Sequence, residues 1–150
     1  PLFSILENLE DHGHLGTMLR TGEGAGITGV IMNQQTVDIF NPKTIRATMG
    51  SIFRVPFVYV PELSTVLTQI HERGIHTYAA HLKGQKYYDS FSFREPTAFL
   101  IGNEGNGLTK EISDQAGQYL KIPMEGKVES LNASIAAALL MYEAHRQRNL

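Results

Sequence analysis

The chain has 150 residues, which suits one domain, and 42% of them are hydrophobic, which is enough for a buried core. It contains no cysteine, which excludes disulfides and thiolate metal sites and fits the reducing environment of the cytoplasm. The formal net charge is −2, so the molecule as a whole does not attract polyanions and any nucleic-acid surface has to be local.

Short apolar runs alternate along the chain with segments of helical periodicity. The expected strands are residues 3–6, 29–32, 57–60, 75–80, 98–101 and 119–122. The expected helices are residues 15–25, 42–49, 61–73, a short helix after Thr109, and residues 130–146. Strands that alternate with helices indicate a single α/β domain, residues 1–150, with a mainly parallel sheet.

Capping residues mark several helix boundaries. Asn41 followed by Pro42 is typical of a helix start, and Thr109 is expected to cap the short helix. Glu111 in the first turn of that helix suits the helix dipole. Gly26 is placed to end the first helix in the left-handed conformation.

Two helices are rich in small residues. Gly16, Gly22 and Gly24 each cost the first helix roughly 1 kcal/mol relative to Ala, so we expect another segment to come close to it. In the last helix, small residues lie beside a stripe of larger ones: Ala133, Ser134, Ala136, Ala137 and Ala138 beside Leu131, Ile135, Leu139 and Tyr142. Two interpretations stay open: this helix packs on the sheet, or it packs tightly against a threaded loop or a second subunit.

Two polar loops each follow an apolar run and precede a helix. Residues 102–107 follow the strand at 98–101, and residues 124–132 follow the strand at 119–122. In open α/β sheets, ligands bind in the crevice beyond the carboxyl ends of the strands. The two loops are therefore expected to form one site.

A basic segment lies in the first half of the chain. No acidic residue occurs between Asp38 and Glu62, and this window holds Lys43, Arg46 and Arg54. Phosphate favours helix N-termini and arginine side chains. The segment is therefore either a solvated helix face or a phosphate-binding patch for RNA or a nucleotide.

Two other patterns are weak. His12 and His14 form a histidine pair, but no third ligand follows at a clear spacing, so no metal is expected. Residues 24–29 match the G-x-G-x-x-G pattern, but they run from a helix end into a strand, which is the reverse of a dinucleotide fingerprint. No apolar run is long enough to span a bilayer, and no signal-peptide pattern is found.

Three segments resemble, in the right order, the signature motifs of the SpoU (TrmH) branch of the SPOUT methyltransferases. They are Leu-Gly-Thr-Met-Leu-Arg-Thr at 15–21, Phe-Leu-Ile-Gly-Asn-Glu-Gly-Asn-Gly-Leu at 99–108, and residues 122–134. Residues 41–56 also resemble that branch. The resemblance covers nearly the whole chain, and three ordered motifs are more specific than one.

The resemblance implies transfer of a methyl group from S-adenosylmethionine to a ribose 2′-hydroxyl of tRNA or rRNA. It also implies a deep C-terminal trefoil knot, an exception to the rule against threading, and a homodimer with the site near its interface. The implied cofactor contacts are Gly102, Ile122 and Leu131, with Ala80 as a further candidate. The implied catalytic positions are Arg20, Glu104, Ser130 and Asn132.

Those residue types suit the reaction, because the attacking hydroxyl loses its proton and oxyanion character needs stabilisation. A guanidinium has a pKa above about 12, so we expect Arg20 to clamp the hydroxyl and its adjacent phosphate instead of acting as a base. Asn132 and Ser130 are expected to orient the ribose or Arg20. Glu104 is expected either to hold Arg20 or to shape the Gly-rich loop.

One position departs from the family pattern. His14 stands where the family usually has Asn, and it is bulkier and titratable while keeping a donor and an acceptor. Three roles stay open for it: orienting the substrate, altering substrate choice, or marking lost activity. The last would make the protein a non-catalytic, knotted RNA-binding dimer that retains the cofactor pocket.

RNA selection is a separate question. Many relatives carry an N-terminal RNA-binding extension, which is not among these residues. Because the chain starts at Pro1, almost directly on a strand, we expect further residues upstream. Either such a domain or the window holding Lys43, Arg46 and Arg54 would then select the RNA.

Overall fold

The computed structural model describes residues 1–128 and 130–150 and contains one six-stranded sheet. The strands are β1 (Leu2–Leu6), β2 (Gly29–Asn33), β3 (Phe57–Val60), β4 (His76–Ala80), β5 (Thr97–Ile101) and β6 (Gln118–Leu120). They are ordered β3-β2-β1-β5-β4-β6, and every neighbouring pair runs parallel. The predicted parallel α/β architecture is confirmed.

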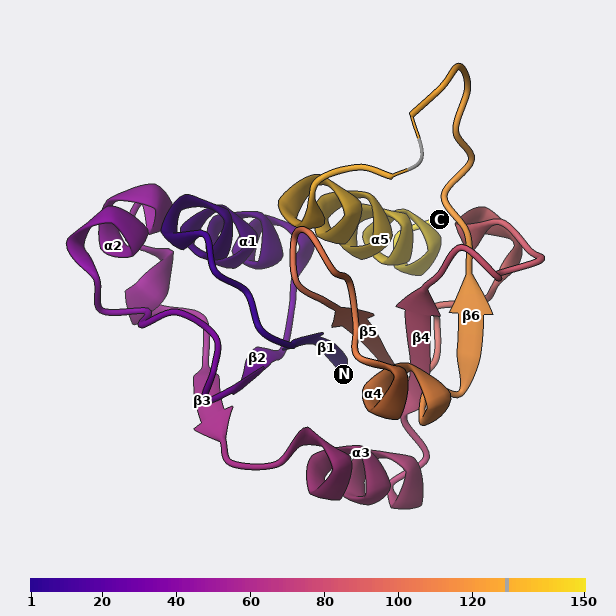
Figure 1. The fold of residues 1–150 in the computed structure, drawn as a ribbon, viewed down its shortest axis with the longest axis horizontal. Helices are drawn as coiled ribbons and strands as arrows, with labels where there is room; N and C mark the ends of the chain where they lie inside the picture. The colour runs from indigo at the N-terminus through magenta and orange to yellow at the C-terminus, as the bar shows by residue number, and fades with distance from the viewer. Residues whose placement is uncertain (129) are drawn as a thin grey trace.

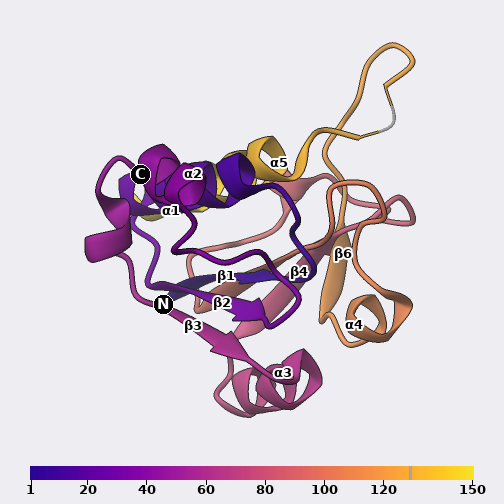
Figure 2. The same ribbon diagram turned by 60° about the vertical axis from the view of Figure 1, so that its left-hand side comes forward.

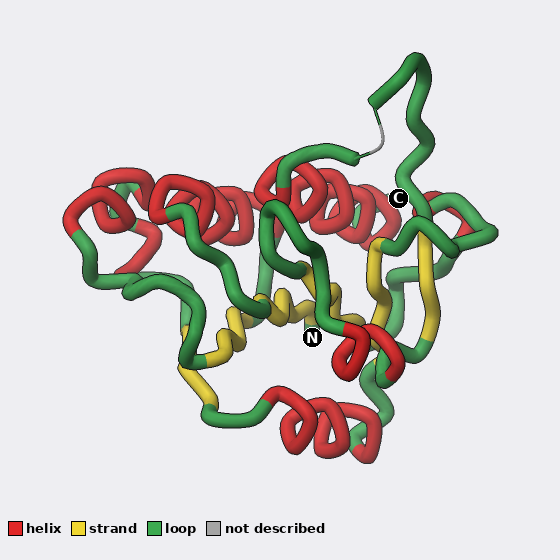
Figure 3. The backbone as a smooth tube through the Cα atoms, in the orientation of Figure 1, coloured by secondary structure: helices red, strands yellow, loops and turns green. Residues whose placement is uncertain are grey.

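Helices cover both faces of this sheet. They are α1 (His12–Ala25), α2 (Pro42–Thr48), α3 (Leu63–Glu72), α4 (Lys110–Asp114) and α5 (Ala133–Arg148), with short 3₁₀ turns η1 (Ser51–Phe53) and η2 (Tyr88–Ser90). In Figure 1, α1, α2 and α5 lie above the strands and α3 and α4 lie below them, and the turned view of Figure 2 keeps this layering. Figure 3 shows the same layers, with strands between two sets of helices. Among the described residues, none of the helices combines the length and apolar character needed to cross a membrane.

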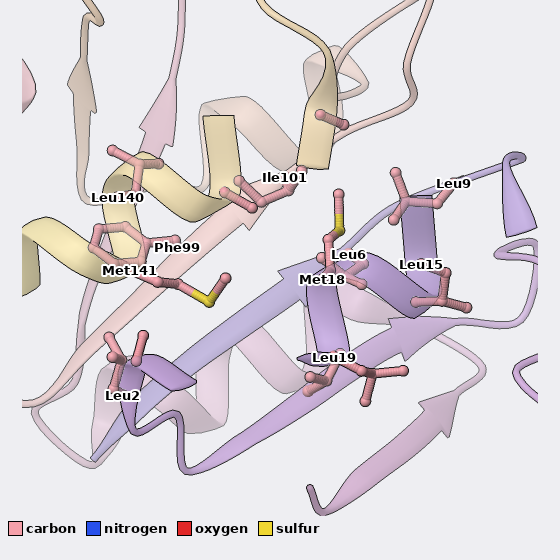
Figure 4. Packing of buried hydrophobic residues seen from close by; sticks show 14 of the residues in the cluster. Leu2, Leu6, Leu9, Leu15, Met18, Leu19, Phe99, Ile101, Leu140 and Met141 are labelled. Atoms are coloured by element: carbon pink, nitrogen blue, oxygen red, sulfur yellow. The ribbon is translucent and has the colours of Figure 1, made fainter. Parts of the chain in front are cut away.

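Side chains of the central strands alternate between two hydrophobic cores, one on each face. On β1, Leu6 lies in the core that includes α1 and α5, whereas Ile5 lies in the core that includes α3. Figure 4 shows the first core, where Leu15 and Met18 of α1 and Leu140 of α5 pack over the strands. Burying one such side chain contributes about 1.5–3 kcal/mol.

Capping explains why two helices start at residues other than those predicted. The structure begins α1 at His12, because the Asp11 side chain accepts the backbone N–H of His14 at 2.9 Å. It begins α5 at Ala133, because Asn132 Oδ1 accepts the backbone N–H of Ile135 at 2.9 Å. The predicted starts at residues 15 and 130 are therefore wrong, since hydrophobic periodicity does not reveal the cap.

Other boundaries are closer to the prediction. Asn41 caps α2 through a 2.9 Å hydrogen bond from Lys43 N, and Gly26 follows α1 with a φ of 83°, as expected. Helix α3 starts at Leu63 instead of residue 61. The last strand ends at Leu120, so residue 122 lies in the following loop and not in the strand.

The glycines of α1 do mark close approaches. A Cβ on Gly16 would lie 2.5 Å from both Ala47 Cβ and Thr44 O of α2, and one on Gly24 would lie 2.6 Å from the Tyr142 hydroxyl of α5. Helix α1 is thus held tightly between α2 and α5.

The small residues of α5 pack inward, which favours the first of the two interpretations for them. Ala133, Ala137 and Ala144 are buried in the core shared with α1 and the sheet. The large residues of the predicted stripe that fall within α5 stay exposed: Ile135 at 46%, Leu139 at 36% and Tyr142 at 46%. These three side chains form an apolar stripe on the outer surface of α5.

Candidate functional site

The candidate site lies at the carboxyl ends of β1 and β5, which are neighbours in the middle of the sheet. The chain leaves β1 towards α1 on one face and leaves β5 towards α4 on the other (Figure 1). Adjacent strands whose connections diverge in this way open a crevice between their following loops. The loop at 102–107 lies at this edge of the sheet, where it is hydrogen-bonded to the segment that follows β1.

Glu104 joins the two loops. Its carboxylate accepts the backbone N–H of Glu10 at 3.1 Å and that of Asp11 at 2.8 Å. Partial burial raises the pKa of Glu104, but the backbone N–H groups, led by that of Glu10, outweigh this and leave the pKa below its ordinary value. Glu104 is therefore held as an anion that anchors the segment preceding α1.

A second carboxylate makes the reciprocal connection. Glu7 follows β1 and is only 5% exposed, and its carboxylate accepts the Thr109 backbone N–H at 2.8 Å and the Thr109 hydroxyl at 2.9 Å. Thr109 also caps α4 by accepting the backbone N–H of Ile112, as predicted. Glu7 and Glu104 thus tie the β1 and β5 loops together in both directions.

Three asparagines complete this framework. Asn8 has a φ of 58°, a left-handed conformation that Asn tolerates better than most residues. Asn33 Nδ2 donates to Asn8 Oδ1 at 2.7 Å, and Asn103 Nδ2 donates to the Asn8 carbonyl at 2.7 Å. Asn103 Oδ1 also accepts the backbone N–H groups of Gly105 and Asn106, which shapes the Gly-rich loop.

Sequence reasoning missed these framework residues: Glu7, Asn8, Asn33 and Asn103. The signal was available for three of them, because polar residues directly after a buried strand at Glu7, Asn8 and Asn33 point to the carboxyl edge of a parallel sheet. The hydrogen-bond partners of these residues could not be predicted from the sequence, because they depend on the order of the strands in the sheet.

Arg20 lies on the exposed surface of α1. Among the hydrogen bonds and ion pairs of the described residues, none joins it to Glu104. Within one chain, the hydrogen bonds of the Glu104 carboxylate therefore go to the loop before α1, and the suggested role of Glu104 in holding Arg20 stays a prediction. Thr17, one helical turn before Arg20, lines a groove between α1 and α5.

His14 faces Glu104. Its Nδ1 lies 3.5 Å from Glu104 Oε2 and is buried without a hydrogen-bond partner among the described residues. The described residues contain no group of three or more His, Asp or Glu side chains arranged to hold a metal. His14 is accordingly positioned against a carboxylate, with one ring nitrogen left unsatisfied.

The expected cofactor residues gather at the same edge of the sheet. Ala80 ends β4, Gly102 follows β5 and Ile122 lies two residues beyond β6, and these three strands are neighbours. Ala80, Gly102, Ile122 and Leu131 are all half-buried, so each presents some surface at a rim instead of lying in the core. A Cβ on Gly102 would lie 2.2 Å from the Gly107 backbone, which only glycine permits.

Ser130 and Asn132 precede α5 and are exposed. Asn132 Oδ1 accepts both the Ile135 N–H and the Ser134 hydroxyl, the latter at 2.8 Å. Its side-chain NH₂ is therefore the group that remains for a ligand.

In the folded structure, an acidic side chain from outside the basic segment lies against it. Lys43 and Arg46 are exposed on α2, but the Arg54 guanidinium pairs with Glu23 of α1, which also accepts the Ser51 hydroxyl at 2.6 Å. The hydrogen bond from Arg54, followed by that from Ser51, lowers the pKa of Glu23 to about 2. Arg54 thus fixes η1 to α1, and its guanidinium is already paired with a carboxylate of the same chain.

Comparison with known proteins identifies a matching family and several relatives. The model of the SpoU rRNA Methylase family matches residues 1–142. A TrmH family tRNA/rRNA methyltransferase of Bacillus subtilis is 35% identical over 149 residues, which are 99% of this chain and 60% of that protein. A TrmH family homologue from Staphylococcus haemolyticus is 37% identical over 97% of this chain and 58% of its own length.

Solved structures share the fold. The SpoU methyltransferase AviRb from Streptomyces viridochromogenes in complex with AdoMet matches with a TM-score of 0.92 and 32% identity, over 98% of this chain and 60% of that chain. The AdoMet-bound rRNA methyltransferase from Sinorhizobium meliloti matches with a TM-score of 0.90 and 36% identity, over 97% and 56%. An RNA 2′-O ribose methyltransferase matches with a TM-score of 0.88 and 34% identity, over 99% and 57%.

This chain spans about 60% of the length of the curated relatives that it matches. The match of the family model nevertheless extends from the first residue into α5, so it includes both polar loops and the crevice between β1 and β5. The chain belongs to the SpoU rRNA methylase family.

Proposed function

We propose that the protein transfers a methyl group from S-adenosylmethionine to a ribose 2′-hydroxyl of tRNA or rRNA. Family membership supports an RNA methyltransferase, and one structural neighbour is described as an RNA 2′-O ribose methyltransferase. The proposal rests on one structural observation. The Glu104 and Glu7 carboxylates accept hydrogen bonds that hold the loops after β5 and β1 next to each other.

The rim residues fit S-adenosylmethionine. Ala80, Gly102, Ile122 and Leu131 offer apolar side chains and backbone groups, which suit an adenine ring held without charged partners. When bound, S-adenosylmethionine supplies an electrophilic methyl group. The rigid Gly-rich loop, shaped by Asn103, would keep its backbone groups in place for such a ligand.

Arg20 is the proposed group for the ribose hydroxyl. A guanidinium offers several donors in a fixed plane, so it can bind the hydroxyl oxygen and a neighbouring phosphate together. Ser130 and the Asn132 NH₂ are proposed to orient the ribose. Glu104 would act indirectly, by positioning the loop before α1, and His14 would lie beside it.

The protein is proposed to work as a homodimer through α1 and α5. A groove of about 450 Å³ runs between these helices, lined among others by Thr17, Thr21, Leu139 and Tyr142. The exposed stripe of Ile135, Leu139 and Tyr142 borders it. A second copy seated there would cover the stripe, and the family resemblance implies that the site lies near such an interface.

A trefoil knot between β4 and α5 is also proposed, as the family resemblance implies. Its support is the tight packing of the segment after β6 on the segment after β4, where Lys121 N donates to the Lys86 carbonyl at 2.9 Å. RNA binding by Lys43 and Arg46 is proposed as well, because both are exposed on one face of α2.

The proposed function is tested by two measurements on the wild-type protein. Calorimetry with S-adenosylmethionine is expected to show one cofactor per chain. Tritium from labelled S-adenosylmethionine is expected to appear in tRNA or rRNA as a 2′-O-methylnucleoside. Absence of cofactor binding, or label on a base, would refute the proposal.

A second candidate is a non-catalytic RNA-binding dimer that retains the cofactor pocket. The observation that favours it is His14, whose unsatisfied Nδ1 faces Glu104 where the family usually has Asn. Cofactor binding without transfer to any RNA, restored by His14→Asn, would select this candidate.

A further inference from the structure

Exposed lysines gather at the edge of the sheet formed by β6, outside the site described above. Lys83 and Lys86 lie in the segment after β4, and Lys121 directly follows β6. All three are exposed. We refer to Lys83, Lys86, Tyr87 and Lys121 as the β6-edge patch.

Backbone hydrogen bonds hold this patch together. Lys121 N donates to the Lys86 carbonyl at 2.9 Å, and Tyr88 N donates to the Lys121 carbonyl at 2.8 Å. His81 N donates to the Leu120 carbonyl at 3.0 Å, which fixes the turn that carries Lys83. Lys86 and Lys121 therefore lie on two backbone segments that are hydrogen-bonded to each other, and Lys83 lies on the turn before them. The backbone positions of all three lysines are fixed by these hydrogen bonds.

The charge of the patch is not neutralised locally. No acidic residue occurs in residues 73–88 or 115–124, and the flanking acids Asp89 and Glu125 lie outside both stretches. Among the described residues, the ion pairs do not include Lys83, Lys86 or Lys121, whereas Lys110 pairs with Asp114 at 2.8 Å. The patch is thus a local positive surface on a chain whose net charge is −2.

An aromatic side chain accompanies these cations. Tyr87 is 51% exposed, directly follows Lys86 in the chain and forms a parallel β-bridge with Lys121. Exposed aromatic rings next to lysines are the combination that binds single-stranded RNA, because the ring stacks on an unpaired base while the cations contact phosphates. An acidic protein partner would use the lysines but not the ring.

We propose that the β6-edge patch binds RNA, with Lys83, Lys86 and Lys121 on phosphates and Tyr87 on a base. The inference rests on the proposed function and extends it to a second RNA surface. Lys121 adjoins Ile122 of the cofactor rim, so the bound strand would lie next to the reacting nucleotide. Helix α2, with Lys43 and Arg46, lies at the opposite end of the molecule (Figure 1). Two separated contacts would fix the direction in which RNA crosses the crevice.

The test compares two double variants that each remove two positive charges. Lys83→Ala/Lys86→Ala removes two of the three lysines of the patch, and the control is Arg73→Ala/Lys110→Ala, at the C-cap of α3 and the start of α4. Fluorescence anisotropy measures the dissociation constant for a labelled tRNA transcript and for oligouridine. The patch variant is expected to bind about tenfold more weakly at about 0.1 M salt, and its log–log salt slope should be shallower by roughly 1.5. The control is expected to stay within about twofold of wild type.

Tyr87→Ala tests the proposed stacking contact independently of the lysines. It is expected to weaken oligouridine binding at least about fivefold, with a smaller effect on fully paired RNA, because stacking requires an unpaired base. Equal losses in both double variants would overturn the proposal, since net charge would then explain them. Loss of binding to an acidic poly-glutamate peptide with RNA binding unchanged would also overturn it.

Calorimetry with S-adenosylmethionine on the same variants separates this proposal from the proposed function. Unchanged cofactor affinity shows that the variants are folded. A wild-type protein that binds RNA through the patch but transfers no methyl group would refute the proposed function and leave the patch supported. Normal methyl transfer with patch variants that bind RNA like wild type would refute the patch alone.

Discussion

The Glu104 carboxylate accepts the backbone N–H of Asp11 at 2.8 Å, which joins the loop after β5 to the N-cap residue of α1. Asp11 in turn accepts the His14 N–H at 2.9 Å, so the start of α1 is fixed by a chain of two carboxylates. Arg20 lies on the same helix. The Gly-rich loop thus helps to fix the start of the helix that carries the proposed ribose-binding residue.

Replacing Glu104 tests how strongly this connection stabilises the folded protein. Glu104→Gln keeps the shape but replaces one acceptor oxygen with an NH₂ that cannot accept an N–H. Hydrogen bonds to charged groups contribute about 1.5–3 kcal/mol, so we expect the free energy of unfolding to fall by about 1–3 kcal/mol. Urea denaturation measures it. Glu10→Gln, an exposed carboxylate in the same segment, is the control and should change little.

Gly16→Ala probes the contact between α1 and α2. Ala is the better helix former by roughly 1 kcal/mol, yet a Cβ at this position would lie 2.5 Å from the Thr44 carbonyl oxygen. Because that oxygen belongs to the backbone and cannot move aside, we expect a net loss of about 1–3 kcal/mol in unfolding free energy.

Gly24→Ala is the matched control for this substitution. Its Cβ would meet only the Tyr142 hydroxyl, the end of a half-exposed side chain. We expect this variant to be as stable as wild type or more stable. A Gly16→Ala variant that is equally stable would show that α1 and α2 are less tightly packed than described.

The ion pair between Arg54 and Glu23 predicts an acid-dependent stability. The pKa of Glu23 is about 2 in the folded protein, below that of an unpaired Glu near about 4.3. Because the folded-state pKa is the lower one, the stabilisation is complete above about pH 4.3 and is lost as the pH falls towards 2. Thermal unfolding from pH 5 to about pH 2 should therefore show a steeper decline for wild type than for Arg54→Ala.

Titration of the Glu23 carboxyl carbon by NMR checks the cause. Arg54→Ala should move the pKa of Glu23 up towards the ordinary value, and Arg73→Ala, directly after α3, should leave it unchanged. An unchanged Glu23 pKa in Arg54→Ala would mean that the pair does not form in solution.

Arg20→Lys tests the proposed geometry of the hydroxyl clamp. Lysine keeps the charge but loses the planar set of donors, so we expect methyl transfer to fall by at least about 100-fold while cofactor affinity stays unchanged. Arg73→Lys is the control. Full activity of Arg20→Lys would mean that charge alone suffices.

Local signals made much of the fold predictable. Asn41 and Thr109 cap the helices that they were expected to cap, and the apolar runs did form parallel strands. Each of these features depends on a few neighbouring residues. The predicted starts of α1 and α5 failed because Asp11 and Asn132 cap them from outside the periodic segment.

The framework of the site depends on contacts between distant parts of the chain. Glu7 and Thr109 are 102 positions apart, and Glu23 and Arg54 are 31 positions apart. The order of strands β1 and β5 brings the first pair together, and the packing of η1 against α1 brings the second pair together. The identities of the loop residues could thus be read from the sequence, but their partners could not.

The most direct test of the central claim is nucleoside mass mapping of RNA incubated with the protein and labelled S-adenosylmethionine. We expect wild-type protein to place the label on a ribose 2′-oxygen, and we expect Arg20→Ala to lose this product while still binding the cofactor. A labelled base, or equal ribose labelling by wild type and Arg20→Ala, would contradict it.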